Sequence, residues 1–67
     1  MKIKVIEDYG EVYESGRIME ASELIGDYID CLDKINYSET IEFLQNDENT
    51  SLKFIGDMWG LKYEIVD

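Results

Sequence analysis

Carboxylates are the reactive groups that this chain offers in number. Its 67 residues include 16 Asp and Glu, six Lys and Arg, one cysteine and no histidine, for a formal net charge of −10. Histidine most often transfers protons near neutral pH, and the thiol of Cys31 has no imidazole to activate it. A chain this short also has little room for a deep pocket. The sequence therefore predicts a protein that is not an enzyme and has no cofactor.

The spacing of the oxygen-bearing residues does not indicate a metal site. Asp27, Asp30 and Asp33 recur every three residues on an expected helix, whereas calcium loops place oxygen ligands at alternate positions of a bent backbone. Residues 46–49 are rich in oxygen atoms, but they lack the glycine and the distant glutamate of such a loop, and we interpret them as a turn. With one cysteine and no histidine, a Cys/His zinc site and an internal disulfide are both excluded.

Five acidic residues are spaced to share one face of a helix. They are Glu20, Glu23, Asp27, Asp30 and Asp33. Steps of three or four residues separate them by about 4.5 to 6 Å along a helix axis, close to the ~3.4 Å advance of successive phosphates along a duplex. We expect this acidic face, with Glu7, Asp8 and Glu11 from the first turn, to occupy a phosphate-binding groove of a basic protein. The other interpretation is a solvated face that only keeps the protein soluble.

The negative charge also excludes partners. A surface with a net charge of −10 repels nucleic-acid phosphates and anionic lipid headgroups, so we expect neither direct nucleic-acid binding nor membrane binding. No apolar run approaches the roughly 18 residues of a membrane span, and no signal segment is recognised. Together with the single cysteine, these features predict a cytoplasmic protein of a bacterial or phage-infected cell.

In composition, the chain resembles small DNA-mimic inhibitors encoded by phages and mobile elements, including anti-restriction and anti-CRISPR proteins. The shared features are small size, about one acid per four residues, few cations and no catalytic residues. The resemblance is to a class and covers no sequence motif. It implies an inhibitor that blocks a positively charged nucleic-acid-binding protein.

A small protein–protein interaction module is the alternative function. Such a module could be immunity- or antitoxin-like, a regulatory subunit or a homodimer. Met58 and Trp59 are residue types enriched at interface cores, and they lie beside Ile55 in a segment that we interpret as a turn between strands. Trp59 is expected to pack over Gly56. An apolar patch on the open sheet face would strengthen this hypothesis, and its expected members are Ile6, Leu44, Ile55 and Val66.

The chain is predicted to form a single domain, residues 1–67. In its first half, two elements must position the acidic residues. Residues 1–15 are predicted to form a hairpin around residues 8–10, with Ile6 opposite Val12 and Val5 opposite Tyr13. Residues 20–35 are predicted to form a helix, because their apolar side chains fill one continuous arc of roughly 160°. Cys31 lies on that arc, and we expect it to be buried.

Residues 37–45 permit two interpretations. A helix could begin at Ser38, with Ile41 and Leu44 facing inward. A strand is favoured, because turns at residues 46–49 and 56–59 then give favourable cross-strand pairs. These pairs are Ile41 with Phe54, Phe43 with Leu52, Phe54 with Leu61 and Leu52 with Tyr63. The predicted fold class is α+β: an antiparallel sheet of about five strands, comprising a two-strand hairpin and a three-strand meander, with one helix packed on one face.

Overall fold

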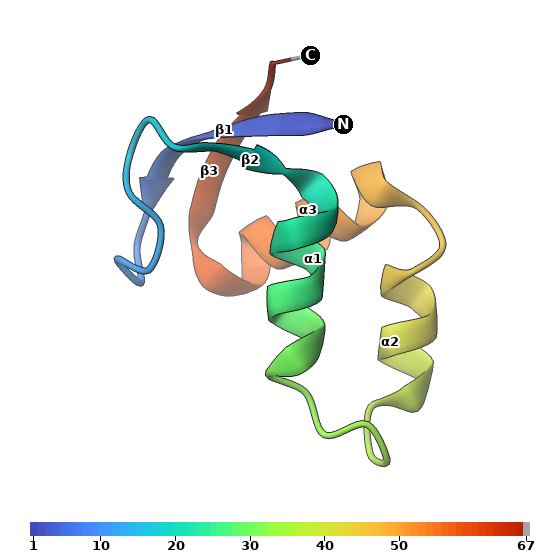
Figure 1. Ribbon diagram of the computed structural model, residues 1–67. Coiled ribbons are helices and arrows are strands. Elements are labelled where there is room, and N and C mark those ends of the chain that lie inside the picture. The colour runs from blue at the N-terminus through green and yellow to red at the C-terminus, as the bar shows by residue number, and fades with distance from the viewer. Residues whose placement is uncertain (67) are drawn as a thin grey trace.

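The computed structural model describes residues 1–66 and has an α+β fold in which the helices lie to one side of a small sheet (Figure 1). Its elements in chain order are β1 (Lys2–Asp8), β2 (Ile18–Glu20), α1 (Ala21–Asp30), α2 (Ser38–Leu44), α3 (Glu48–Trp59) and β3 (Leu61–Ile65). The described residues form three helices and one antiparallel sheet of three strands, in the order β2-β1-β3. The α+β class is confirmed, but the five strands and single helix are not.

The first strand does not fold back on residues 11–15 as predicted. It pairs instead with β2, with Ile3 opposite Met19, and residues 9–17 form a loop. The reason lies at Asp8, whose carboxylate accepts hydrogen bonds from the backbone N–H groups of Gly10, Val12 and Tyr13 at 2.9 to 3.1 Å. These bonds hold the chain in a wide turn, so Val12 is 72% exposed rather than paired with Ile6.

Helix α1 confirms the body of the predicted helix. Its inward face carries Ala21, Leu24, Ile25 and Tyr28, all buried. The helix ends at Asp30, five residues before the predicted end, and Cys31 is exposed. The predicted burial of Cys31 is therefore wrong.

A turn after α1 explains this early end. The Asp33 carboxylate accepts hydrogen bonds from the backbone N–H of Ile35 at 2.9 Å and from the side chain of Asn36 at 2.8 Å. Such local bonds by an aspartate compete with helix continuation. As a result Ile35, expected on the inward arc, is 88% exposed.

Residues 38–59 form two helices rather than two strands, so the predicted meander is wrong. The helix interpretation of residues 38–44 is correct: Leu44 is buried and Ile41 is half-buried. In α3 the buried residues Ser51, Leu52, Ile55 and Gly56 follow the spacing of one helix face, which the strand alternation hid. The buried Ser51 hydroxyl donates a 2.7 Å hydrogen bond to the carbonyl oxygen of Leu44 and so ties α3 to α2.

The end of α3 replaces the predicted turn at residues 56–59. These residues are the last turn of the helix, and Gly60, with φ of 66°, takes the left-handed conformation that favours glycine at this position. The chain then enters β3, which confirms a strand at residues 61–65. Its neighbour is β1, with Val5 opposite Tyr63 and Ile3 opposite Ile65, and not the segment around Phe54.

One core joins the sheet to the helices. Its fully buried side chains include Ile3 and Val5 from β1, Leu24 from α1, Leu44 from α2, and Leu52 and Ile55 from α3. Every element therefore contributes to the core: β2 and β3 do so through Met19 and Leu61, each 5% exposed, and the other elements through fully buried side chains. The helices are fixed to the sheet by apolar packing, which holds their outer faces in a defined arrangement.

Candidate protein-binding surfaces

The negative charge is concentrated on the helical part of the chain. Residues 21–60 contain nine acidic and two basic residues, a net charge of −7, and all nine carboxylates are on exposed residues. Strands β1 and β3 together carry three acidic and three basic residues and have no net charge. We call the exposed surface of residues 21–60 the acidic helical layer.

The predicted row of five carboxylates is divided among three elements. Glu23, Asp27 and Asp30 lie on α1, and all three are exposed. Glu20 is the last residue of β2, with its carboxylate 3.6 Å from the N-terminal ammonium, and Asp33 lies in the turn after the helix. The row is therefore not the continuous helical face that the sequence predicts.

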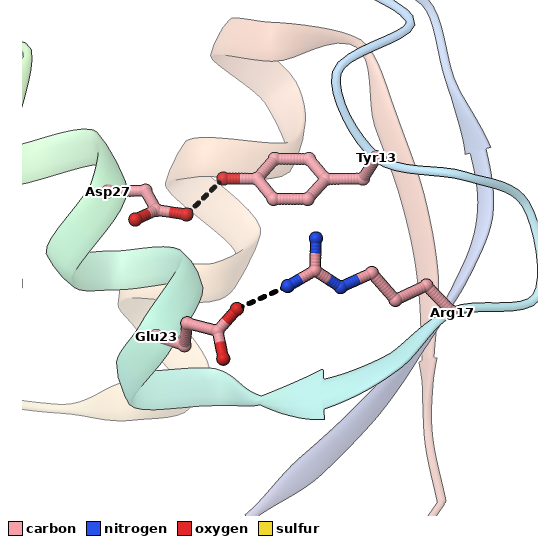
Figure 2. A network of polar contacts seen from close by, with 4 residues as sticks. All are labelled: Tyr13, Arg17, Glu23 and Asp27. Atoms are coloured by element: carbon pink, nitrogen blue, oxygen red, sulfur yellow. Dashed lines mark hydrogen bonds and ion pairs between the residues drawn. The ribbon is translucent and has the colours of Figure 1, made fainter.

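Two members of the row are engaged by the loop of residues 9–17 (Figure 2). The Tyr13 hydroxyl donates a 2.6 Å hydrogen bond to Asp27, and the Arg17 guanidinium pairs with Glu23 at 2.5 Å. Burial, together with the Asp27 carboxylate, raises the pKa of the Tyr13 hydroxyl above its ordinary value of 10, so this group stays a hydrogen-bond donor to a higher pH than a free tyrosine. Within residues 1–66, Asp30 is the α1 member of the row that makes no hydrogen bond or ion pair through its side chain.

The acids predicted around the first turn have separate positions. Glu7 lies opposite Lys62 on β3, with 3.7 Å between carboxylate and ammonium. Asp8 uses its carboxylate to hold the loop, as described above. Glu11 is exposed in that loop, with φ of 57°. Two of these three acids therefore have a local structural partner.

The alternative site around Trp59 is only partly assembled. Ile55 is fully buried and offers no surface to a partner. Trp59 is half-buried against Tyr28 and Tyr13, with ring centroids 5.0 and 6.3 Å away. The ring over Gly56 is that of Tyr63, which a Cβ on Gly56 would meet at 3.4 Å. Met58 is 60% exposed. Trp59 also lines a small concavity of about 120 Å³ together with Asp8, Gly10 and Val12.

The predicted apolar patch on the open sheet face does not form. Leu44 and Ile55 are buried within the helices, because the segments that carry them are not strands. Ile6 and Val66 are exposed, as that hypothesis required. Half of the predicted patch is therefore part of the core.

An open concavity beside α2 was not predicted. It has a volume of about 520 Å³ and is lined by Glu39, Glu42, Phe43, Gln45 and Asn46. Phe43 is 44% exposed and meets Phe54 edge-on, with 5.8 Å between ring centroids. A helix over residues 38–44 places positions 39, 42 and 43 on one face, so the helix interpretation of this segment could have predicted these lining residues.

Carboxylate and amide oxygens accept hydrogen bonds, and the face of an aromatic ring attracts a cation. The concavity beside α2 can therefore hold an arginine or lysine side chain. Within residues 1–66, no three Asp, Glu, Cys or His side chains gather closely enough to hold a metal ion. The same part of the chain has no helix with the length and apolar character needed to cross a membrane.

Comparison of the chain with protein-family models, curated proteins and solved structures gave no match. We therefore infer a function from the surfaces described above.

Proposed function

We propose that this protein is a non-enzymatic binding protein whose acidic helical layer occupies the nucleic-acid groove of a basic protein and blocks it. The observation that carries this proposal is the segregation of charge: nine exposed carboxylates against two cations in residues 21–60. A one-sided field of this kind steers a basic partner toward the helices and away from the neutral strands.

The carboxylates best placed for the role are those without an internal partner. They include Asp30 on α1 and Glu39 and Glu42 on α2, all exposed. Glu23 and Asp27 are less available, because Arg17 and Tyr13 bind them. We therefore place the centre of the binding surface on Asp30 and the α2 concavity, rather than on α1 alone.

Phe43 adds a feature that a row of charges lacks. Its exposed ring lines the same concavity as the carboxylates of Glu39 and Glu42. Nucleic-acid grooves grip phosphates with arginine and lysine, and an arginine can stack on an aromatic ring while it pairs with a carboxylate. The α2 concavity thus supports binding to a basic groove in particular.

Partner capture from a nuclease-treated bacterial lysate tests the proposal, with a salt gradient for elution. We expect a nucleic-acid-binding protein that elutes at moderate salt and cannot bind DNA or RNA while this protein is attached. Capture should be lost with the triple variant D30N/E39Q/E42Q. It should be retained with the control E7Q/E20Q/E64Q, which removes the same number of charges from the strands. A partner that resists high salt, or one that still binds nucleic acid, would contradict the proposal.

The interaction module is retained as a second candidate because of the apolar residues around Trp59. Met58, Val12 and Tyr9 all expose most of their side chains, and Val12 and Trp59 line one concavity. For this function, Met58→Ala should weaken capture while D30N/E39Q/E42Q leaves it unchanged. Met58 is the better probe than Trp59, since Trp59 also packs against the core.

A further inference from the structure

The outer edge of β3 is an unpaired strand edge. In the sheet order β2-β1-β3, both β2 and β3 have a neighbour on one side only. β2 has three residues and leads directly into α1, so it offers little edge. β3 has five residues, and Ile65 near its end is 51% exposed. A strand edge of this kind presents free N–H and C=O groups to another chain.

The hydrogen-bonding pattern shows which groups of β3 face outward. Val66 N–H donates to the carbonyl oxygen of Lys2 at 3.0 Å, and Tyr9 N–H donates to the carbonyl oxygen of Gly60 at 3.1 Å. In an antiparallel pair, alternate residues direct their N–H and C=O groups toward the same neighbour. Positions 60, 62, 64 and 66 therefore face β1, and positions 61, 63 and 65 face away from it.

We infer that a second copy of this chain pairs with that edge, β3 to β3 and antiparallel, with the two-fold axis at Tyr63. In this register Tyr63 of each copy exchanges two hydrogen bonds with Tyr63 of the other. Lys62 of each copy lies opposite Glu64 of the other. These are the non-hydrogen-bonded positions, at which opposed side chains approach most closely, with about 4.5 Å between Cα atoms.

Charge selects this register over its neighbours. Parallel pairing in register would place Lys62 against Lys62, and like charges opposite each other destabilise a ladder. A two-fold axis at Ile65 would leave Lys62 outside the ladder and place Glu64 opposite Val66. The register centred on Tyr63 alone gives two opposite-charge pairs while it joins outward-facing backbone groups.

The surroundings of the edge are compatible with this partner. β1 and β3 have no net charge, so a second copy meets less repulsion there than on the acidic helical layer. At the Leu61 end, α3 comes close: a Cβ on Gly56 would lie 3.0 Å from the Leu61 carbonyl oxygen. The open part of the edge runs from residue 62 to residue 66, and the Tyr63 and Lys62–Glu64 pairs fall within it.

The resulting dimer would have one six-stranded sheet. Opposed residues of an antiparallel pair point to the same face, so both acidic helical layers would lie on one side of that sheet. The inference does not depend on the proposed function, although it would double the length of acidic surface presented to a partner.

A charge exchange tests the inference, with the molar mass measured by sedimentation equilibrium. The wild type should form a species of twice 7.8 kDa, and both Lys62→Glu and Glu64→Lys should raise the dimer dissociation constant about tenfold or more. The double variant K62E/E64K should recover the dimer, because each copy again opposes unlike charges. All three variants change exposed residues, but each also places like charges opposite each other within the monomer, at Glu7 and position 62 or at Lys4 and position 64. Circular dichroism therefore checks that each variant folds before its mass is compared.

The backbone contribution is tested by Tyr63→Pro. This variant removes the N–H group that each copy donates to Tyr63 of the other copy and that faces away from β1, so it should abolish the dimer, and circular dichroism checks that the monomer remains folded. A wild-type protein that is monomeric up to about 1 mM would overturn the inference. So would a dimer that all of these variants leave intact, since another surface would then hold it together.

Discussion

The sheet and the acidic helical layer treat charge in opposite ways. On the sheet, three charged residues of β1 lie opposite an unlike charge: Lys2 opposite Glu20, Lys4 opposite Glu64 and Glu7 opposite Lys62. In the acidic helical layer, seven of nine carboxylates make no hydrogen bond or ion pair with a cation or a tyrosine, and Glu23 and Asp27 are bound by the loop of residues 9–17.

This difference separates two uses of charge. Opposite charges across strands favour one register, because a shift by one residue would place like or apolar groups opposite them. Uncompensated carboxylates on the helices give the fold no such benefit and repel one another. We infer that the sheet charges serve folding and that the helical charges serve binding, and the following experiments test that division.

The largest effect should come from reversing charge on the helices. D30K/E39K/E42K should reduce capture of a basic partner by at least about 100-fold, because three attractive contacts become repulsive. The same three exposed changes should leave the thermal unfolding midpoint within a few degrees of the wild-type value. Isothermal titration with the captured partner measures the first quantity and circular dichroism the second. Equal losses from E7K/E20K/E64K would remove the distinction between the two regions.

A second effect concerns stability and should come from Asp8. Asp8→Ala removes the acceptor for three backbone N–H groups of the loop, and we expect a loss of about 2 kcal/mol in the free energy of unfolding. Urea denaturation measures it. Glu11→Ala, a change of a neighbouring exposed carboxylate in the same loop, is the matched control and should change stability by less than about 0.5 kcal/mol. A similar loss in both variants would show that Asp8 has no special role.

Tyr13→Phe should produce a smaller change, with a distinct dependence on pH. Loss of the hydrogen bond to Asp27 should cost about 1 kcal/mol at neutral pH. The folded protein raises the pKa of Tyr13 above its ordinary value of 10, so its contribution is complete below pH 10 and is lost as the pH rises beyond that value.

Tyr63 acts in the same direction, because burial and the Asp57 carboxylate raise its pKa. Tyr13→Phe should therefore reduce, rather than remove, the fall in unfolding free energy above pH 10. Each tyrosine contributes at most about 1.4 kcal/mol per pH unit. Urea denaturation at pH 7 to 11 gives the slope, and an unchanged slope in Tyr13→Phe would show that the Tyr13–Asp27 contact is not maintained in solution.

The sequence correctly predicted those elements whose apolar pattern fits only one type of secondary structure. The body of α1 was predicted because its apolar residues occupy one helical arc and no other regular structure accommodates them. Residues 61–65 were predicted as a strand by their alternation, but the choice of β1 as neighbour depends on contacts distant in sequence. Local periodicity carries no information about such pairing.

The errors arose where the apolar residues of one segment fit both the two-residue repeat of a strand and the repeat of a helix. Ile41, Phe43 and Leu52 satisfy a strand alternation, whereas Leu44, Ser51 and Ile55 become buried only when α2 and α3 pack against the remaining core. The α2 concavity was missed for this reason. The wide loop after β1 was missed because it depends on three hydrogen bonds to the Asp8 carboxylate, which no pattern of apolar residues reveals.

The smallest effect, and the sharpest test of the comparison, is the response of folding stability to salt. The acidic helical layer repels itself within a molecule whose radius of gyration is 11.5 Å, and the Debye length falls from about 30 Å at 0.01 M salt to about 10 Å at 0.1 M. Screening this repulsion should stabilise the fold, whereas screening the exposed Glu7–Lys62 pair should destabilise it slightly.

Because the helical charges are more numerous and uncompensated, we expect the unfolding free energy to rise by about 1 kcal/mol between 0.01 and 0.3 M NaCl. The variant D30N/E39Q/E42Q should show a smaller rise, and E7Q/E20Q/E64Q should not. Binding to a basic partner should weaken over the same range of salt concentration. Added salt should therefore raise the folding stability and lower the binding affinity. If the unfolding free energy falls as salt increases, attraction between the paired charges of the sheet contributes more to stability than repulsion between the helical carboxylates. The helical carboxylates would then lack the uncompensated repulsion from which we infer their binding role.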